Sequence, residues 1–300
     1  MHDVIIIGGG PAGFSAAIYS ARFKLKTLVL TKVPGGTMAE AHIIENYPGI
    51  QSISGMQLAD QMQKQAEDLG VEFILDDVKL VERRGDLFLV NDKHESKYIV
   101  LCLGTERKKL NLPREQEFTG KGVSYCATCD APLFRDKVVG VVGGSDSAIM
   151  AADLLARYAK KVYIIYRKEK FPAQPVNVDK ALASKNVEAV YKTNVTELKG
   201  SGMLKSVMLD TGKELALDGL FIEIGSTPST ALAIELGLEL DEHGCIVVDS
   251  EQETNVHAVY AAGDVTGTHN RWRQVIVAAA EGAIAAHSIY HDKPGKHGSV

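Results

Sequence analysis

The sequence opens with His2-Asp-Val-Ile-Ile-Ile-Gly8-Gly-Gly-Pro-Ala-Gly13, and this stretch decides the fold. Its β-branched apolar run predicts a buried strand that ends at the first glycine. The small residues from Phe14 to Arg22 then predict a helix, and the apolar run from Lys26 to Thr31 predicts a second strand. Strand, glycine turn, helix and strand make a βαβ unit, which indicates a doubly wound parallel sheet.

The same pattern recurs in the middle of the chain. Lys137-Val-Val-Gly-Val-Val-Gly143 predicts a strand, Gly143 to Ala148 a turn, Ile149 to Tyr158 a helix, and Lys161 to Tyr166 a second strand. The two glycine turns are separated by roughly the length of one domain. The fold class we predict is therefore α/β, with two Rossmann-like dinucleotide-binding domains.

The composition is that of an ordinary globular protein. The 300 residues are 45% hydrophobic and 24% charged, the net charge is −5, and no long run of like charges suggests a nucleic-acid partner. The first apolar run is far shorter than the roughly 20 residues that cross a bilayer, and it ends in glycines rather than a cleavage site. The chain has only four cysteines. We therefore expect a cytoplasmic protein that binds neither nucleic acid nor membrane.

The first glycine turn has the spacing of a pyrophosphate-binding loop. Gly8 makes the tight turn, Gly10 lets the backbone approach a pyrophosphate, and Gly13 lets helix and strand pack closely. The helix N-terminus then favours the negative charge of the phosphates. Thr31 stands where an acid would bind the ribose of NAD, which weakens an NAD interpretation of this half of the chain and leaves FAD open.

A second FAD contact is expected near the C-terminus. The apolar run that begins at Ala258 predicts a strand that ends in Gly263-Asp264, and a carboxylate at such a strand end can bind a ribityl chain. The first domain is then made of two pieces with the second domain inserted between them. We predict residues 1–111 and 246–300 as the FAD-binding domain, and residues 112–245 as an NAD(P)-type domain.

The second glycine turn departs from the usual spacing. Gly143 and Ala148 hold the first and last positions of the motif, but Ser145 replaces the middle glycine and would crowd a pyrophosphate. After the next strand, Arg167 and Lys168 can meet a 2′-phosphate, because charge-assisted contacts to phosphate favour basic side chains. A solvated basic turn without a ligand is the alternative interpretation.

The chemistry of the chain is expected at Cys126-Ala-Thr-Cys129-Asp130. Two cysteines at this spacing can close a disulfide, and such environments commonly lower thiol pKa values. Asp130 is then positioned to act as general acid or base. The alternative is half of a zinc site, but zinc needs four ligands and no second Cys-x-x-Cys pair is present.

Together these motifs resemble the low-molecular-weight thioredoxin reductases of bacteria and archaea, which are FAD-dependent pyridine nucleotide-disulfide oxidoreductases. The resemblance covers essentially the whole chain. It is carried by Gly8–Gly13, Gly35-Gly36, Glu45-Asn-Tyr-Pro-Gly49, Cys126–Asp130, Ala261-Ala-Gly-Asp264 and Arg273-Gln-Val275. The cysteine motif is specific, because related flavoproteins that move electrons between ferredoxin and NADP lack it.

The resemblance implies a set of site residues. Those expected to bind FAD are Gly8, Gly10, Pro11, Ala12, Gly13, Gly35, Gly36, Asn46, Gly104, Thr105, Gly263, Asp264, Arg273, Gln274 and Val275. Those expected at the NAD(P) site are Gly143, Ser145, Asp146, Ser147, Arg167 and Lys168. The catalytic residues are Cys126, Cys129 and Asp130, with Cys129 nearer the flavin.

The resemblance also implies an activity. Electrons from NADPH would pass through FAD and the cysteine pair to the disulfide of a thioredoxin or glutaredoxin-like protein, in a homodimer whose domains rotate. The NADPH-selective pattern of the family, His-Arg-Arg-x-x-x-Arg, reads Tyr166-Arg-Lys-x-x-x-Pro172 here. NADH, reduced ferredoxin or a deazaflavin therefore stay open as donors. Two further hypotheses are an FAD dithiol oxidase that uses oxygen and a flavin-binding protein whose cysteines are structural.

Overall fold

The computed structural model describes residues 1–41, 43–267 and 272–292. The chain divides into two compact units, one made of residues 1–106 and 228–300 and the other of residues 107–227. The second unit is therefore inserted into the first. The α/β fold class with two Rossmann-like units is confirmed. Among the described residues, no helix combines the length and apolar character needed to cross a membrane.

The first unit is built on a seven-stranded sheet with the order β3-β2-β1-β6-β5-β4 and with β17 paired to β6. Its strands are β1 (His2–Ile7), β2 (Thr27–Thr31), β3 (Glu72–Leu75), β4 (Val81–Arg84), β5 (Leu87–Val90), β6 (His94–Leu101) and β17 (Val259–Ala261). The β-branched run predicted as the first strand forms β1, which is parallel to both β2 and β6. The β4-β5-β6 part is antiparallel.

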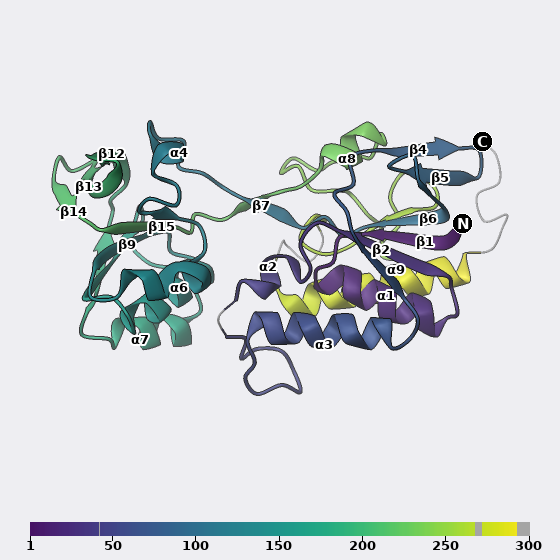
Figure 1. Cartoon of the computed structure of the whole chain (residues 1–300), viewed down its shortest axis with the longest axis horizontal. Coiled ribbons are helices and arrows are strands. Elements are labelled where there is room, and N and C mark those ends of the chain that lie inside the picture. Colours follow the sequence, from purple (N-terminus) through teal and green to yellow (C-terminus); the bar gives the residue numbers. More distant parts are fainter. Residues whose placement is uncertain (42, 268–271, 293–300) are drawn as a thin grey trace. The chain divides into compact units, whose positions relative to one another are not determined.

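Three helices pack together on one side of this sheet: α1 (Pro11–Arg22), α3 (Gly55–Glu67) and α9 (Val275–His291) (Figure 1). A short helix, α2 (Gly36–Ala39), precedes α3. The small residues of α1 allow close approach, since a Cβ added at Gly282 of α9 would lie 2.0 Å from the carbonyl oxygen of Ala12. Packing of α9 on α1 thus joins the two pieces of chain that make the first unit.

The second unit has a fully parallel five-stranded sheet with the order β11-β10-β9-β15-β8. Its strands are β8 (Val123–Ser124), β9 (Val138–Val142), β10 (Lys161–Tyr166), β11 (Val187–Tyr191) and β15 (Gly219–Ile222). The helices α6 (Asp146–Ala156) and α7 (Pro175–Leu182) cover one face. The other face packs on the antiparallel sheet β12 (Val195–Ser201), β13 (Met203–Leu209) and β14 (Glu214–Ala216).

The inserted unit begins and ends earlier than the sequence predicts. The chain crosses between units at β7 (Thr105–Arg107) and at β16 (Ser226–Pro228), which pair with each other. The helix α8 (Ala231–Glu235), predicted as part of the inserted domain, belongs to the first unit because Leu232 and Ala233 pack in its core. Residues 228–245 therefore lie with the FAD-type unit, and the exit from the inserted unit is at β16 rather than at residue 245.

Candidate active site: a redox disulfide between two glycine turns in sequence

Two glycines of the first turn are required by the protein itself. Gly8 follows β1 with φ at +115°, and a Cβ there would lie 2.1 Å from the carbonyl oxygen of Cys102. A Cβ at Gly13 would lie 1.9 Å from the carbonyl oxygen of Gly8. Both contacts are far inside the van der Waals limit. These positions thus let the strand turn sharply into α1 and pack against it, as the motif predicts.

Gly10 differs, because the protein leaves space beside it. It is the N-cap of α1, and a Cβ there would meet only the carbonyl oxygen of Gly35, at 4.0 Å. Gly35 and Gly36 lie opposite this turn, since the Gly35 amide donates to the carbonyl of Gly9 over 2.6 Å. Open space in front of a helix N-terminus, lined by backbone, fits a pyrophosphate. The residues present therefore fit FAD at this turn.

Thr31 has a structural role that explains the missing acid. Its side chain is buried at the end of β2, and its hydroxyl accepts a hydrogen bond from the Gly9 amide over 3.1 Å. In an NAD site an acid at this position would bind the ribose. Here Thr31 supports the glycine turn instead. The NAD interpretation of this half loses its expected ligand for the same reason.

The predicted C-terminal contact of FAD is held by a residue that the sequence analysis missed. The buried Glu281 of α9 accepts a 2.7 Å hydrogen bond from the Gly263 amide, and its carboxylate lies 3.0 Å from the hydroxyl of Thr266. Burial raises the pKa of Asp264, the Arg273 guanidinium opposes this shift, and Glu281 adds to it. An acidic residue within an otherwise alanine-rich helix was the available signal for Glu281.

The predicted FAD residues of the first unit gather at one edge of its sheet. The ends of β1, β6 and β17 are in register, with Ile7 paired to Leu101 and Leu101 to Ala261. Gly8, Gly104 and Gly263 each follow one of these strand ends, and Thr105 begins β7. The carboxyl edge of parallel strands is where such folds bind dinucleotides.

A further contact joins two of the predicted FAD segments that lie far apart in sequence. The amide of Asn46 donates to Oε1 of Gln274 over 2.9 Å. Gln274 is the N-cap of α9, so Arg273 and Val275 stand on either side of that helix start. This contact brings the Glu45–Gly49 segment to the N-terminus of α9.

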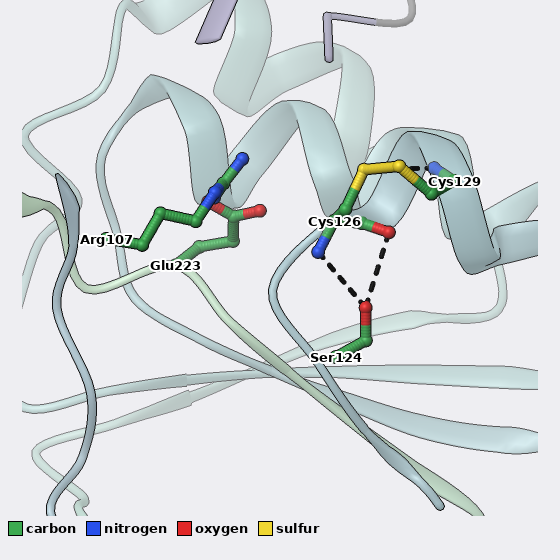
Figure 2. Close-up of a disulfide and its surroundings, with 5 residues drawn as sticks. All are labelled: Arg107, Ser124, Cys126, Cys129 and Glu223. Carbon is green, nitrogen blue, oxygen red and sulfur yellow. Dashed lines mark hydrogen bonds and ion pairs between the residues drawn. A yellow bond between two sulfur atoms is a disulfide. The ribbon is translucent and has the colours of Figure 1, made fainter. Parts of the chain in front are cut away.

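Cys126 and Cys129 form a disulfide in the second unit, with their Cα atoms 5.4 Å apart (Figure 2). Cys126 is the N-cap of a short helix, α5 (Ala127–Asp130), and its sulfur accepts the Cys129 amide over 3.2 Å. Cys126 is half-buried and Cys129 is exposed. Cys102, by contrast, is buried in the first unit, and burial raises the pKa of its thiol. The redox chemistry is therefore expected at the disulfide.

Three residues that the sequence analysis did not single out hold Cys126 in place. The buried hydroxyl of Ser124 bonds both the amide of Cys126, over 3.1 Å, and its carbonyl oxygen, over 3.3 Å (Figure 2). The Tyr125 hydroxyl donates to the carboxylate of Glu115, which is itself buried. Glu115 also accepts the amides of Leu110 and Leu112. The segment before the disulfide is thus fixed by both backbone and side-chain bonds.

The second glycine turn keeps the backbone geometry of the first. Gly143 has φ at +143°, and a Cβ there would lie 2.1 Å from the carbonyl oxygen of Glu223. Ser145 is the N-cap of α6, and its hydroxyl lies 3.0 Å from that of Ser147. The Asp146 carboxylate accepts the amide of Gln174 and the side chain of Asn177. Asp146 therefore ties the turn to the start of α7.

The end of β10 differs from the expected phosphate site. A Cβ at Gly144 would lie 2.6 Å from the Tyr166 ring, so this ring packs directly on the glycine turn. Tyr166 also contacts Phe171, with ring centroids 5.4 Å apart. Arg167 and Lys168 are exposed beyond it. An aromatic side chain thus stands at the strand end, and the two basic side chains remain available to solvent and ligand.

Comparison with known proteins gives one consistent result. The family model described as pyridine nucleotide-disulphide oxidoreductase matches residues 2–282. The thioredoxin reductase of Listeria innocua is 39% identical over 295 residues, which is 95% of this chain and 92% of that protein.

Solved structures agree. The thioredoxin reductase of Lactococcus lactis has a TM-score of 0.92 at 37% identity, covering 97% of this chain and 98% of that one. The thioredoxin reductase of T. acidophilum has a TM-score of 0.90 at 38% identity, covering 96% of this chain and 97% of that one.

Proposed function

Since this chain belongs to the pyridine nucleotide-disulphide oxidoreductase family, we propose that electrons from NADPH pass through FAD and the Cys126–Cys129 disulfide to a thioredoxin-like protein. The chain is an FAD-dependent thioredoxin-disulfide reductase, as its relatives over nearly the full length are thioredoxin reductases. The observation that carries the proposal is the disulfide itself, formed at the carboxyl edge of a dinucleotide-type sheet.

In this proposal the flavin, when bound, supplies two electrons to the disulfide. Breaking the sulfur–sulfur bond then leaves one thiolate and one thiol, and Asp130 supplies the proton. The Cys126 thiolate attacks the partner disulfide, forming a mixed disulfide and releasing one partner thiolate. Cys129, deprotonated by Asp130, attacks Cys126, reforms the intramolecular disulfide and expels the second partner thiolate, and the two partner thiolates take protons from solvent. Atoms and electrons balance in each exchange.

We assign the attack on the partner to Cys126, with Cys129 as the sulfur nearer the flavin. The Cys129 amide donates to the Cys126 sulfur, and a donor to the charged form of a group favours that form. The test is to trap the mixed disulfide with a thioredoxin that lacks its resolving cysteine and whose remaining cysteine carries a thionitrobenzoate disulfide, so that thionitrobenzoate leaves as the mixed disulfide forms. A Cys129→Ser variant should accumulate the complex, whereas a Cys126→Ser variant should not; the reverse pattern would exchange the two roles.

NADPH is the donor that we propose, and its support is the turn at Gly143 with the exposed Arg167 and Lys168. A donor other than NADPH is the second candidate, favoured by the Tyr166 ring on Gly144 and by Pro172. Anaerobic titration of the purified holoenzyme separates them. Bleaching of the flavin band by micromolar NADPH supports the first. An unchanged band at millimolar NADPH removes NADPH, and NADH, reduced ferredoxin and a reduced deazaflavin are then titrated in turn.

The assembly and location are also proposals. We propose a homodimer in the cytoplasm that acts on a thioredoxin or glutaredoxin-like protein. Family membership supports the partner, and the two buried cysteines outside the disulfide, Cys102 and Cys245, are compatible with a reducing compartment. Sedimentation equilibrium of the holoenzyme tests the dimer, since a monomer at micromolar concentration would contradict it.

A further inference from the structure

An ion pair that no part of the proposed electron path uses stands next to the disulfide. Arg107 Nη1 lies 2.8 Å from Glu223 Oε2, and the Glu223 side chain is only 7% exposed. Figure 2 draws this pair together with the disulfide, among the surroundings of the two cysteines. A buried ion pair loses hydration that its own attraction only partly restores, so it is weak evidence for stability alone. Stability alone therefore does not account for the pair.

Strand register places Glu223 beside both functional turns of the second unit. In the parallel pair β8 and β15, Ser124 is opposite Phe221, and the same register continued by two residues puts Cys126 level with Glu223. In the pair β15 and β9, Ile222 is opposite Val142, which puts Glu223 level with Gly143. Neighbouring strands lie about 4.8 Å apart. Glu223 thus stands between the disulfide and the glycine turn at one sheet edge.

Arg107 is fixed at this edge by the chain itself. It is the first residue of the second unit, at the end of β7, and the next amide, of Lys108, donates to the carbonyl of Gly225 over 2.9 Å. Glu223 is anchored in turn, since its amide donates to the carbonyl of Val142 over 2.8 Å. The guanidinium is therefore held from both its backbone and its carboxylate partner.

We propose that Arg107 is a positioning residue that stabilises the Cys126 thiolate, and that Glu223 holds its guanidinium beside the disulfide. The inference rests on the proposed disulfide exchange, in which that thiolate is the attacking group. A nearby cation favours the charged form of a thiol, whereas the Glu223 carboxylate opposes it. The two members of the pair therefore act on Cys126 with opposite signs.

In the two described elements that pack most closely on the short helix α5, and in α5 itself, the ionisable side chains are carboxylates. Asp130 lies on α5 itself, and Asp146 begins α6, which packs on α5. Glu115 lies behind Tyr125, to which it is bonded. The helix that follows, η1 (Ala131–Phe134), carries no ionisable side chain. These groups are all carboxylates or a neutral phenol, so Arg107 supplies the positive charge in this set.

The experiment measures Cys126 directly and needs neither donor nor thioredoxin. Holoenzyme is treated with tris(2-carboxyethyl)phosphine to open the disulfide, and iodoacetamide labelling of Cys126 is followed by peptide mass spectrometry across pH. The midpoint of the rate profile reports the ionisation of that thiol. In Arg107→Met we expect the midpoint to rise by about one pH unit. In Glu223→Gln, whose amide oxygen still accepts from Arg107, we expect it to fall by a similar amount.

Two further variants keep the outcome decisive. The double variant Arg107→Met/Glu223→Gln removes both charges together, so its midpoint should return close to that of the wild type. Arg114→Met breaks the exposed Arg114–Glu117 pair of the same unit and should leave the profile unchanged. Movement of both single variants in one direction, or no movement in either, would overturn the inference and leave the pair a purely structural contact.

A parallel assay of thioredoxin reduction separates the inference from the proposed function. If the wild type reduces no thioredoxin but the two midpoints move apart as expected, the proposed function fails and the role of Arg107 at Cys126 stands. If thioredoxin is reduced and the midpoints do not move, the inference fails and the function stands.

Discussion

The glycines of the first turn have different structural roles. Gly13 is required for packing, because its Cβ would lie 1.9 Å from the Gly8 carbonyl, whereas the space beside Gly10 is left open by the protein. We predict that Gly10→Ala weakens FAD binding by about 1–3 kcal/mol, which is roughly 5- to 150-fold, with little change in the melting temperature of the apoprotein. Gly13→Ala should instead lower that melting temperature. Flavin titration and calorimetry check both. Unchanged FAD affinity in Gly10→Ala would contradict the assigned site.

Asp264, a residue predicted to bind FAD, illustrates how burying a carboxylate lowers the stability of the folded protein. Burial is the main cause that raises the pKa of Asp264, so the folded state disfavours the ionised carboxylate. The folded protein is therefore favoured while Asp264 is protonated, and this contribution to stability is lost as the pH rises through the raised pKa. At neutral pH the charge is therefore destabilising. We predict that Asp264→Asn raises the melting temperature of the apoprotein while weakening FAD binding. Thermal unfolding with and without FAD measures both, and a less stable apoprotein would contradict the argument.

At this scale the sequence predicts the glycines well and their supporting side chains poorly. Spacing identifies Gly8, Gly10 and Gly13 because the motif requires them in local order. The partners of such turns come from distant segments, as Thr31 and Glu281 do, and nothing local marks a threonine or glutamate for that purpose. The sequence does not predict the Arg107–Glu223 ion pair for the same reason, because the order of the strands brings these two residues together.

Between elements, one phenol anchors the end of α9 to the sheet. The hydroxyl of Tyr98, on β6, donates to Asp292 over 2.9 Å, and burial followed by this bond raises the pKa of Tyr98 to about 12. A raised pKa means that the contribution is complete below about pH 10, the ordinary tyrosine value, and is lost as pH rises through about 12.

We therefore predict that Tyr98→Phe is less stable than the wild type by about 1 kcal/mol at pH 8, and that the difference shrinks between pH 10 and 12. Urea unfolding across this range measures it. Tyr19→Phe, at an exposed position of α1, is the control and should show no such trend. A difference that stays constant to pH 12 would show that Tyr98 does not titrate as described.

The apolar periodicity of the sequence predicts where the regular helices and strands lie, but it does not predict the residues at which they begin and end. The strands at both glycine turns lie where the apolar pattern predicts them. The helices α1 and α6 begin three residues earlier than expected, at Pro11 and Asp146, because the glycine turn itself supplies the helix start. Residues 231–235, which form the short helix α8, fell inside the predicted inserted domain, whereas Leu232 and Ala233 pack in the core of the first unit.

At the scale of the whole molecule, one unit is inserted into another and the chain passes between them twice. The internal repeat predicted two units, and the late Gly263-Asp264 predicted that the first would be completed by the C-terminal piece. The crossing points could not be predicted, because β7 and β16 are short and owe their pairing to each other. Arg107 lies at the first of these crossings, and Glu223 lies shortly before the second. The ion pair that these two residues form is therefore at the ends of the inserted unit.

The central claim, that electrons leave the flavin only through Cys126 and Cys129, is tested without reference to the donor. Holoenzyme is photoreduced under anaerobic conditions, mixed with oxidised thioredoxin, and the flavin absorbance and the thiols formed on thioredoxin are recorded. We predict that the wild type regains its flavin absorbance and forms two thioredoxin thiols for each electron pair that photoreduction delivered, and that Cys129→Ser keeps its flavin reduced. Equal reoxidation and equal thiol formation in Cys129→Ser would contradict the account.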